Sequence, residues 1–500
     1  MPKKPKKGEY DAIIIGAGMG GLASAVYLGQ LGYSVLVVES HNRPGGYAHS
    51  FRRKKFVFDS AVRIVAGAEY GLLSELLEKA NLNMDLNFKK MDDIYSVYYP
   101  DKNFTVPRSK EGLINAYIKE FPKEADNINR LVNEMEKIYL STIEMLKEEK
   151  STTIISNKIF MKYKNYTFHD MVSEYLNDSN AIYSFSALWA YFGTPPSKGS
   201  ALFFAYAIMS YFKEDIYYLE GSFQNLATAF SKKIKSLNGE VVLNNEVTKI
   251  DVSENSVQGV YLATNDYVKS NLVISNCDLT KTIFNLVGKD YWPKRYLNKI
   301  SKLNQSTSAF EVFMGIKYPL EKLNLSHETF IYNDYDYTEF ERKHSHLKDL
   351  GPEALSGLAI TTPTLIDSSL APEGHHTSII TTLVPYDIGV EWDSVKEDYQ
   401  NQLIKMAEKA IPNLSKHIVF VESGSPKTME RYTNNSNGAI YGWEQSINQM
   451  NKRPQHETPI KGLYLSGQWT NPGGGVVSVI LSGYQLVEKL KKKGNNNEIH

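Results

Sequence analysis

The stretch from Tyr10 to Glu39 constrains the fold more than any other part of the chain. An apolar run, Ala12 to Ile15, is typical of a buried parallel strand. It leads directly into the glycine-rich sequence Gly16-Ala17-Gly18-Met19-Gly20-Gly21. A segment with helical apolar periodicity follows, and a second strand, Ser34 to Val38, ends at Glu39. Strand, G-x-G-x-x-G, helix and second strand occur in the order that predicts a dinucleotide-binding βαβ unit.

The three motif glycines have different expected roles. Gly16 permits the tight turn, Gly18 lets a pyrophosphate approach the backbone, and Gly21 lets the helix lie close to the strand. Free N–H groups and the positive dipole end at the helix start favour anionic phosphates. Glu39, beside Ser40, is expected to accept hydrogen bonds from both hydroxyls of an adenosine ribose. A glycine-rich loop without a ligand is the alternative interpretation.

The chain length and charge narrow the classes of protein. Five hundred residues are too many for one compact core, so two interwoven or successive domains are expected. Basic and acidic residues balance at 56 each, which argues against a nucleic acid as the main partner. Cys277 is the single cysteine, which excludes an internal disulfide framework and fits a reducing compartment.

The N-terminal sequence from Met1 to Gly8 is basic but lacks the apolar stretch of a signal peptide. It predicts a disordered arm, with a tether to an anionic membrane surface as the alternative. No uncharged run reaches the roughly 20 apolar residues that span a bilayer. The predicted location is cytoplasmic, with peripheral contact to the inner face of a membrane left open.

A second tight turn of the backbone is predicted just after the βαβ unit. The doublet Gly45-Gly46 comes shortly after Arg43, which is placed to meet phosphate charge. The sequence Phe56-Val57-Phe58-Asp59 then reads as a short strand. Directly after a dinucleotide strand, the doublet predicts a second wall of the cofactor cleft.

These motifs together carry a family resemblance. G-x-G-x-x-G with Glu39, R-x-G-G at Arg43 to Gly46, and F-x-F-D at Phe56 to Asp59 resemble the flavin-dependent superfamily of phytoene desaturases, carotenoid isomerases and retinol saturases. Amine oxidases and protoporphyrinogen oxidase are more distant members of that fold group. The resemblance implies FAD as cofactor. It also implies an α/β fold, with an FAD-binding Rossmann-like domain of the glutathione-reductase-2 type and an inserted α+β substrate domain.

The C-terminal segment supports the same resemblance. A buried strand ends at Gly467, a glycine turn follows, and an apolar helix covers Val477 to Leu490. The helix start is expected to direct N–H groups at the pyrimidine edge of a flavin. The resemblance assigns cofactor contacts to Gly467, Gln468, Gly474, Gly475 and Val476, and to the backbone of Val247 at the adenine. Gln468 stands where most members of the family carry Asp, so this position brings no charge.

The second domain matches the family only in layout. Asp92 to Arg108 predicts a hairpin, Glu124 to Lys150 one or two long helices, and Ser306 to Ile316 a half-buried strand. The predicted FAD-binding domain is discontinuous, and the substrate domain is inserted in two pieces. The expected bounds are 8–91, 215–290 and 425–492 for the first, 92–214 and 291–424 for the second, and 1–7 and 493–500 for flexible tails.

The segment from Ala181 to Phe212 has an unusual composition, because Lys198 is its only charge and it is rich in aromatic residues. Thr194-Pro195-Pro196 is expected to split it into two helices. One interpretation is core helices of a large domain. The other is a lining for a long apolar substrate, or a patch that enters a membrane to collect one.

Few residues offer acid, base or metal chemistry. Arg63 is the one catalytic candidate: it would stabilise negative charge at the flavin or bind a substrate carboxylate. A structural salt bridge, to Asp59 for example, is the alternative. The histidines lack metal-ligand spacing, so no metal is predicted. No second G-x-G-x-x-G appears, so the electron partner is expected to be a quinone, oxygen or another reductase.

Three functional hypotheses follow. The first is an FAD-dependent oxidoreductase or isomerase that desaturates, saturates or isomerises double bonds of a long apolar polyene, such as a carotenoid, retinoid or unsaturated fatty chain. The second is an amine-oxidase-like flavoenzyme. The third is a non-enzymatic prenyl or lipid carrier on the same fold. The retained cofactor glycines and the sequence Gly438-Ala439-Ile440-Tyr441-Gly442-Trp443-Glu444, which resembles carotenoid isomerases, favour the first.

Overall fold

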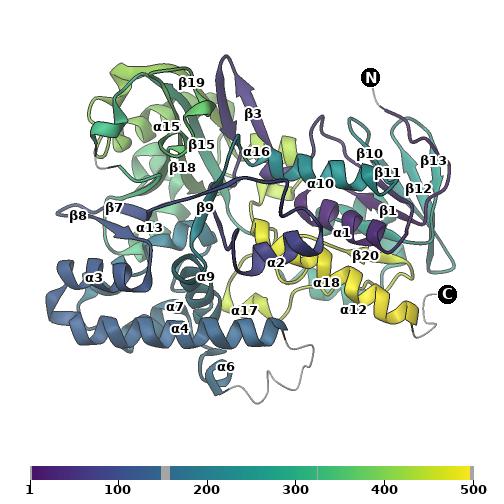
Figure 1. Ribbon diagram of the computed structural model, residues 1–500, viewed down its shortest axis with the longest axis horizontal. Coiled ribbons are helices and arrows are strands. Elements are labelled where there is room, and N and C mark those ends of the chain that lie inside the picture. Colours follow the sequence, from purple (N-terminus) through teal and green to yellow (C-terminus); the bar gives the residue numbers. More distant parts are fainter. Residues whose placement is uncertain (1–2, 148–157, 324, 496–500) are drawn as a thin grey trace.

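The computed structural model describes residues 3–147, 158–323 and 325–495. Its two largest sheets lie on opposite sides of the molecule, with helices packed around both (Figure 1). The first sheet, on the right of the view, contains the predicted dinucleotide-binding unit. The second sheet is on the left, above a group of helices.

The first sheet has five parallel strands in the order β10-β2-β1-β14-β20. In the central strand, Ile14 is in register with Val37 on one side and Ile274 on the other. The sheet therefore joins segments from the beginning, middle and end of the sequence. The strands are β1 (Ala12–Ile15), β2 (Val35–Val38), β10 (Glu240–Val242), β14 (Val273–Ser275) and β20 (Leu463–Leu465).

Both faces of this sheet are covered, which explains its unbroken apolar strands. Ala12 and Ile14 pack on the helical side, against α1 (Met19–Gln30), α10 (Gln224–Ser236) and α18 (Val476–Asn495). Ile13 and Ile15 pack on the other side, against a small antiparallel sheet of β11 (Val247–Ser253), β12 (Ser256–Leu262) and β13 (Tyr267–Lys269).

The helices α1 and α18 contact each other closely, although they come from opposite ends of the sequence. A side chain at Gly483 would place its Cβ 2.8 Å from the Gly20 carbonyl oxygen. That separation is shorter than a normal van der Waals contact. Glycine at position 483 is therefore what lets the two backbones approach.

The second sheet has seven strands in the order β19-β15-β18-β17-β16-β7-β8, antiparallel except between β16 and β7. Residues such as Val312 and Ile380 pack on one face against α15 (Trp392–Ala407). The strands are β7 (Asp93–Tyr98), β8 (Asn103–Pro107), β15 (Ser308–Ile316), β16 (Glu328–Tyr332), β17 (Gly357–Thr361), β18 (His376–Val384) and β19 (Ile418–Gly424).

The predicted hairpin at Asp92 to Arg108 is present as β7 and β8. The strand predicted at Ser306 to Ile316 is present as β15, but its expected half-burial was wrong. All nine residues of β15 are buried. The reason is that its second face is also covered. There Phe313 packs against the hairpin of β3 (Ser50–Arg53) and β4 (Phe56–Asp59).

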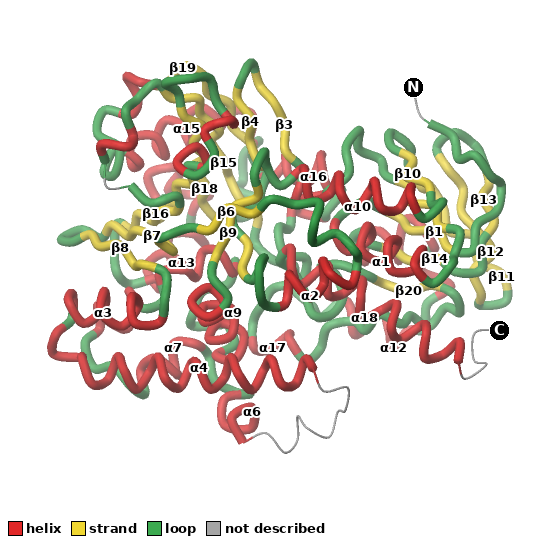
Figure 2. The backbone as a smooth tube through the Cα atoms, viewed as in Figure 1, coloured by secondary structure: helices red, strands yellow, loops and turns green. Residues whose placement is uncertain are grey.

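The helices below the second sheet in Figure 2 are α3 (Lys110–Glu120), α4 (Ala125–Lys147), α6 (Lys158–Tyr163), α7 (Phe168–Ser173) and α9 (Ala201–Lys213). The predicted long helix is α4, and residues 148–150 of that prediction lie outside the described residues. The expected helix before Thr194 was wrong. A short helix, α8 (Ser179–Ser184), is followed there by a 3₁₀ turn, η3 (Ala187–Phe192). The Ser184 hydroxyl donates to the Ala181 carbonyl, a local bond of the kind that competes with a continuing helix.

Short elements connect the two sides. A small sheet in the order β5-β9-β6 lies between them.

The predicted domain bounds and flexible tails stay predictions, although Lys4 pairs with Asp266 and the Lys6 N–H donates to Glu240. The remaining elements are β5 (Val65–Ala66), β6 (Phe88–Lys90), β9 (Ile216–Leu219), α2 (Leu72–Lys79), α11 (Leu279–Lys281), α12 (Lys294–Ile300), α13 (Tyr337–Ser345), α14 (Leu347–Leu350), α16 (Pro426–Thr433) and α17 (Ile447–Met450).

Candidate functional site

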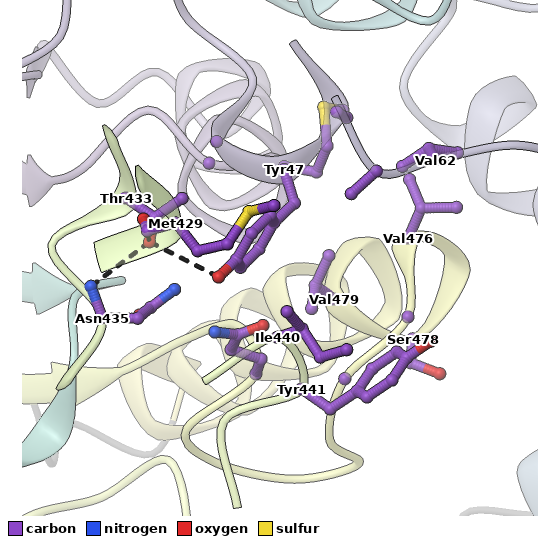
Figure 3. A pocket seen from close by; sticks show the side chains of 18 of the residues that line it. Tyr47, Val62, Met429, Thr433, Asn435, Ile440, Tyr441, Val476, Ser478 and Val479 are labelled. Carbon is purple, nitrogen blue, oxygen red and sulfur yellow. Dashed lines mark hydrogen bonds between the residues drawn. The ribbon is translucent and has the colours of Figure 1, made fainter. Parts of the chain in front are cut away.

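A cavity of about 650 Å³ connects the two sides of the molecule. Its wall includes the ends of β1 and β2, the start of α18, one face of α9 and one face of the second sheet. Figure 3 shows the part of the cavity that Tyr47, Tyr441 and Val476 line. The cavity therefore joins the predicted cofactor cleft to the aromatic segment in one continuous space.

The glycine loop after β1 forms a cradle in which side chains have no room. A Cβ at Gly18 would lie 2.7 Å from the Asn276 side-chain nitrogen, and one at Gly20 would lie 2.8 Å from the Gly467 Cα. A Cβ at Gly21 would overlap the Gly16 carbonyl oxygen. The helix α1 begins here with no side chain capping its first N–H groups. Uncapped N–H groups beside a bare backbone suit a pyrophosphate.

Glu39 lines the cavity at the end of β2. Its Oε2 accepts from the Ala17 N–H at 2.7 Å, and its Oε1 accepts from the His41 N–H at 2.7 Å. Burial raises the pKa of this carboxyl, whereas the two backbone donors oppose that shift. The carboxylate is thus fixed in orientation beside the glycine cradle, at the position where a ribose is expected.

The second predicted wall lies against the first. The Gly45 N–H donates to the Ala17 carbonyl at 2.8 Å, and Gly46 and Arg43 line the same space. The Arg43 guanidinium donates to the Ser50 carbonyl at 2.7 Å, which orders the loop. Val247, at the start of β11, also lines the cavity.

The C-terminal turn closes the opposite side of the cradle. Gln468, Gly474, Gly475 and Val476 line the cavity at the start of α18. Gly467 lies behind them, where its N–H donates to the Ser482 hydroxyl at 3.1 Å and a Cβ would overlap the Asn276 side chain.

The predicted cofactor residues therefore gather around one space. Three of them, Ala17, Gly21 and Gly467, pack behind the wall, and the others line it. The residues present fit FAD on three observations: a cradle that any Cβ would fill, an uncapped helix start, and a carboxylate at the end of the second strand. The lining residues are Gly16, Gly18, Met19, Gly20, Glu39, Ser40, Arg43, Gly45, Gly46, Val247, Gln468, Gly474, Gly475 and Val476.

Two tyrosines in the wall have hydroxyls bound to backbone carbonyls from other segments. The Tyr47 hydroxyl donates to the Ala439 carbonyl at 3.1 Å, and the Tyr441 hydroxyl donates to the Tyr191 carbonyl. Burial raises the pKa of Tyr47 to about 12, so it stays protonated at neutral pH. Tyr441 belongs to the sequence G-x-I-Y-G-W-E, but no sequence signal pointed to Tyr47.

Arg63 lines the cavity, and its partner differs from the suggested one. The Arg63 Nη2 lies 2.5 Å from Glu311 Oε1 on β15, and both side chains are buried. Asp59 contributes only its backbone carbonyl to Arg63, because its carboxylate accepts from Ser50, Tyr218 and the Phe223 N–H. The suggested Arg63–Asp59 side-chain bridge was therefore wrong. The residue that sequence reasoning missed is Glu311, which lies 248 positions away.

The far arm of the cavity is apolar and aromatic. Residues of α9 at helical spacing face it, namely Phe203, Tyr206, Ala207, Ser210 and Tyr211. The turn η3 contributes Trp189, Tyr191 and Phe192 to the same wall. The opposite face of α9, with Phe204 and Met209, is buried in the core, as the first interpretation of the aromatic segment expects. That the cavity face lines a substrate or enters a membrane stays a prediction.

Among the described residues, no group of three or more His, Cys, Asp or Glu side chains is arranged to hold a metal ion. No helix in the described part of the chain combines the length and apolar character needed to cross a bilayer.

Comparison with known proteins gives a family match over nearly the whole chain. The family model described as flavin containing amine oxidoreductase matches residues 19–490. Prolycopene isomerase 2, chloroplastic, from an Oncidium hybrid cultivar is 26% identical over 506 aligned positions, which cover 96% of this chain and 84% of that protein. The 4,4'-diaponeurosporene oxygenase of Staphylococcus aureus strain MW2 is 25% identical, over 97% of this chain and 99% of its own.

Solved structures share the fold. An oxidoreductase from Methanosarcina mazei superposes with a TM-score of 0.68 at 17% identity, covering 95% of this chain and 99% of that one. A putrescine oxidase bound to putrescine gives a TM-score of 0.66 at 14% identity, covering 97% and 99%.

Proposed function

Because the chain belongs to the family of flavin-containing amine oxidoreductases, and is therefore an FAD-dependent enzyme, we propose that it desaturates, saturates or isomerises double bonds of a long apolar polyene. The observation that carries this proposal is the apolar arm that continues from the cofactor cradle to α9 and η3 within one cavity. The relatives named for carotenoid-type substrates, prolycopene isomerase and 4,4'-diaponeurosporene oxygenase, support the same substrate class.

The chain's own residues supply binding, orientation and exclusion of water. FAD, when bound, supplies the electron chemistry. Flat aromatic side chains such as Phe203 and Tyr206 have few rotatable bonds and offer large apolar area to an extended polyene. Burial of such a chain removes water from the reacting bonds.

An amine substrate is less well matched by the same cavity. An ammonium group needs a carboxylate whose charge and oxygens are not already engaged by other groups. The cavity is lined by Glu39 and Glu246 in the cofactor cleft and by Glu214 and Glu311 farther along. Glu311 is paired with Arg63, and the two oxygens of Glu214 accept from the Tyr139 hydroxyl at 2.7 Å and from the Leu72 N–H at 3.3 Å.

The redox partner and the source of substrate are part of this proposal. A quinone, oxygen or another reductase would accept or donate electrons, since the sequence offers no second dinucleotide motif. Apolar polyenes dissolve in membranes, so we propose peripheral contact with a membrane during substrate collection.

The test uses the purified protein with its FAD. Oxidised and reduced enzyme are each incubated with a conjugated polyene and, separately, with a primary amine, and the product spectra are followed. We expect the polyene spectrum to change and the amine to remain. Turnover of the amine without any change in the polyene would overturn the proposal. Faster turnover with liposome-embedded polyene than with detergent-dispersed polyene would support membrane contact.

A further inference from the structure

The cavity-facing side of the second sheet carries buried polar residues within an otherwise apolar wall. We call Glu311, Thr381, Thr361 and Glu328 the polar band. Glu311 on β15 is in register with Thr381 on β18, and Glu328 on β16 is in register with Thr361 on β17. The members of each pair therefore lie on the same face of the sheet. Glu311 is 3% exposed and Glu328 is fully buried. Carboxylates are rarely buried to this extent without a specific partner.

Most polar atoms of the band are satisfied within the chain. Arg63 donates to Glu311 Oε1, and the Thr381 hydroxyl donates to the same oxygen at 3.2 Å. Glu328 Oε2 accepts from the Tyr191 hydroxyl and from the Thr361 hydroxyl. Arg63 balances the charge of Glu311, and the Nε2 of His327 lies 3.1 Å from Glu328 Oε1.

Two carboxylate oxygens of the polar band accept no hydrogen bond from the described residues, Glu311 Oε2 and Glu328 Oε1, and of these two residues Glu311 lines the cavity. Glu311 Oε2 is buried and has no hydrogen-bond partner among the described residues, while Glu311 itself lines the cavity. A buried carboxylate oxygen without a donor costs free energy, on the order of 1–3 kcal/mol. A ligand in the cavity that donates a hydrogen bond would remove that cost.

We propose that Glu311 is a specificity-determining residue, whose Oε2 accepts a hydrogen bond from a hydroxyl group carried by the polyene. This inference rests on the proposed function, and it narrows the substrate to an oxygenated polyene rather than a pure hydrocarbon. A hydroxyl fits better than charged groups do. A carboxylate would be repelled by Glu311, and an ammonium would add a second cation beside Arg63.

The test compares two probes with the same conjugated chain. Parinaryl alcohol, a fluorescent linear tetraene, carries a terminal hydroxyl, and its methyl ether keeps the oxygen but lacks the donor. Their Kd values are measured at about pH 8.5, above the range in which Glu311 holds a proton, by fluorescence titration of the FAD-loaded protein. The readout is therefore binding and not turnover. We expect the wild type to bind the alcohol at least about tenfold more tightly than the ether, as for one well-made hydrogen bond to a charged group.

The variant Glu311→Gln separates a hydrogen bond from a steric effect, since it keeps the shape of the side chain. Its amide oxygen can still face Arg63, which turns the NH₂ group toward the position of Oε2. We expect the preference for the alcohol to fall below about threefold, with unchanged FAD content. Glu214→Gln is the matched control, because Glu214 lines the same cavity but both its oxygens already have donors. It should keep the wild-type preference.

Three outcomes are distinguishable. Loss of the preference in Glu311→Gln alone supports the inference. Equal binding of alcohol and ether by the wild type overturns the inference and leaves the proposed function intact, whether or not the variant folds. Binding of neither probe by FAD-loaded wild type overturns the proposed function and the inference together.

Discussion

Glu311 combines two opposing electrostatic effects at one residue. Burial raises the pKa of its carboxyl from 4.5 to about 7, while Arg63 and the Thr381 hydroxyl oppose that rise. Besides Arg63, the tyrosines Tyr47 and Tyr441 are the ionisable groups that interact with it, and both are protonated at neutral pH. The folded protein therefore holds a proton on Glu311 over a pH range in which the unfolded chain has released it.

This difference predicts a pH-dependent stability. Between about pH 4.5 and 7 the folded state binds more protons than the unfolded state, so the contribution of Glu311 is full below pH 4.5 and is lost as pH rises to 7. The loss amounts to about 3 kcal/mol. Urea unfolding at intervals from pH 4 to 8 should show a decline for wild type that is shallower in Glu311→Gln. Parallel curves for the two proteins would contradict the assignment.

The glycine cradle gives a second prediction at the residue scale. Gly18→Val is expected to fold but to lose FAD, because its Cβ meets only the end of the Asn276 side chain and would occupy the space of the phosphates. Gly21→Val is expected to fail to fold, because its Cβ would overlap the Gly16 carbonyl oxygen in the backbone. The flavin absorbance and the circular dichroism of each purified variant test this. A yellow, folded Gly18→Val protein would refute the phosphate assignment.

At the scale of the element, α9 has two faces with different expected tolerances. Ala207→Phe adds a ring on the cavity face and should weaken polyene binding by at least about tenfold, while FAD content and fold are kept. Ala205→Phe adds the same ring on the opposite face, which is fully buried, and overpacking there should cost about 1–3 kcal/mol or more. Probe titration and thermal unfolding separate the two effects. Equal polyene binding by Ala207→Phe and wild type would place the substrate elsewhere.

Local patterns in the sequence predict some of these elements and not others. The βαβ unit could be predicted because its turn, its helix start and its strands are encoded within thirty neighbouring residues. The double-sided burial of β15 could not, since its alternating pattern does not reveal that α15 and the β3–β4 hairpin cover both faces. The Arg63–Glu311 pair could not be predicted for a similar reason, because nothing near Arg63 in the sequence identifies a partner on β15.

At the scale of the whole molecule, the cavity wall takes residues from the N-terminal unit and from the start of α18. FAD is therefore expected to hold these two parts together. At a hundredfold excess over Kd, a ligand specific for the folded state adds about 2.7 kcal/mol to the free energy of unfolding. The melting temperature of FAD-loaded protein should exceed that of apoprotein and rise with free FAD. A melting temperature that does not depend on FAD would show that the folded state does not bind it, and so that FAD does not join these parts.

The same arrangement predicts how the two halves of the cofactor are recognised. ADP carries only the half expected at Gly18 and Glu39, so Gln468→Ala should weaken the binding of FAD and leave that of ADP unchanged. Gly18→Val should weaken both. Calorimetric titration of apoprotein with each ligand measures this. An equal loss of ADP affinity in Gln468→Ala would place Gln468 at the adenosine half.

The position of β20 has a consequence for biosynthesis. This strand, residues 463–465, lies beside β14, and α18 then packs against Gly20 on α1. A ribosome makes β20 after the other four strands of the sheet, so β14 keeps an unpaired edge in the growing polypeptide until residues 463–465 have been synthesised. Chaperones that shield such edges would therefore meet the nascent chain before its cofactor can be retained.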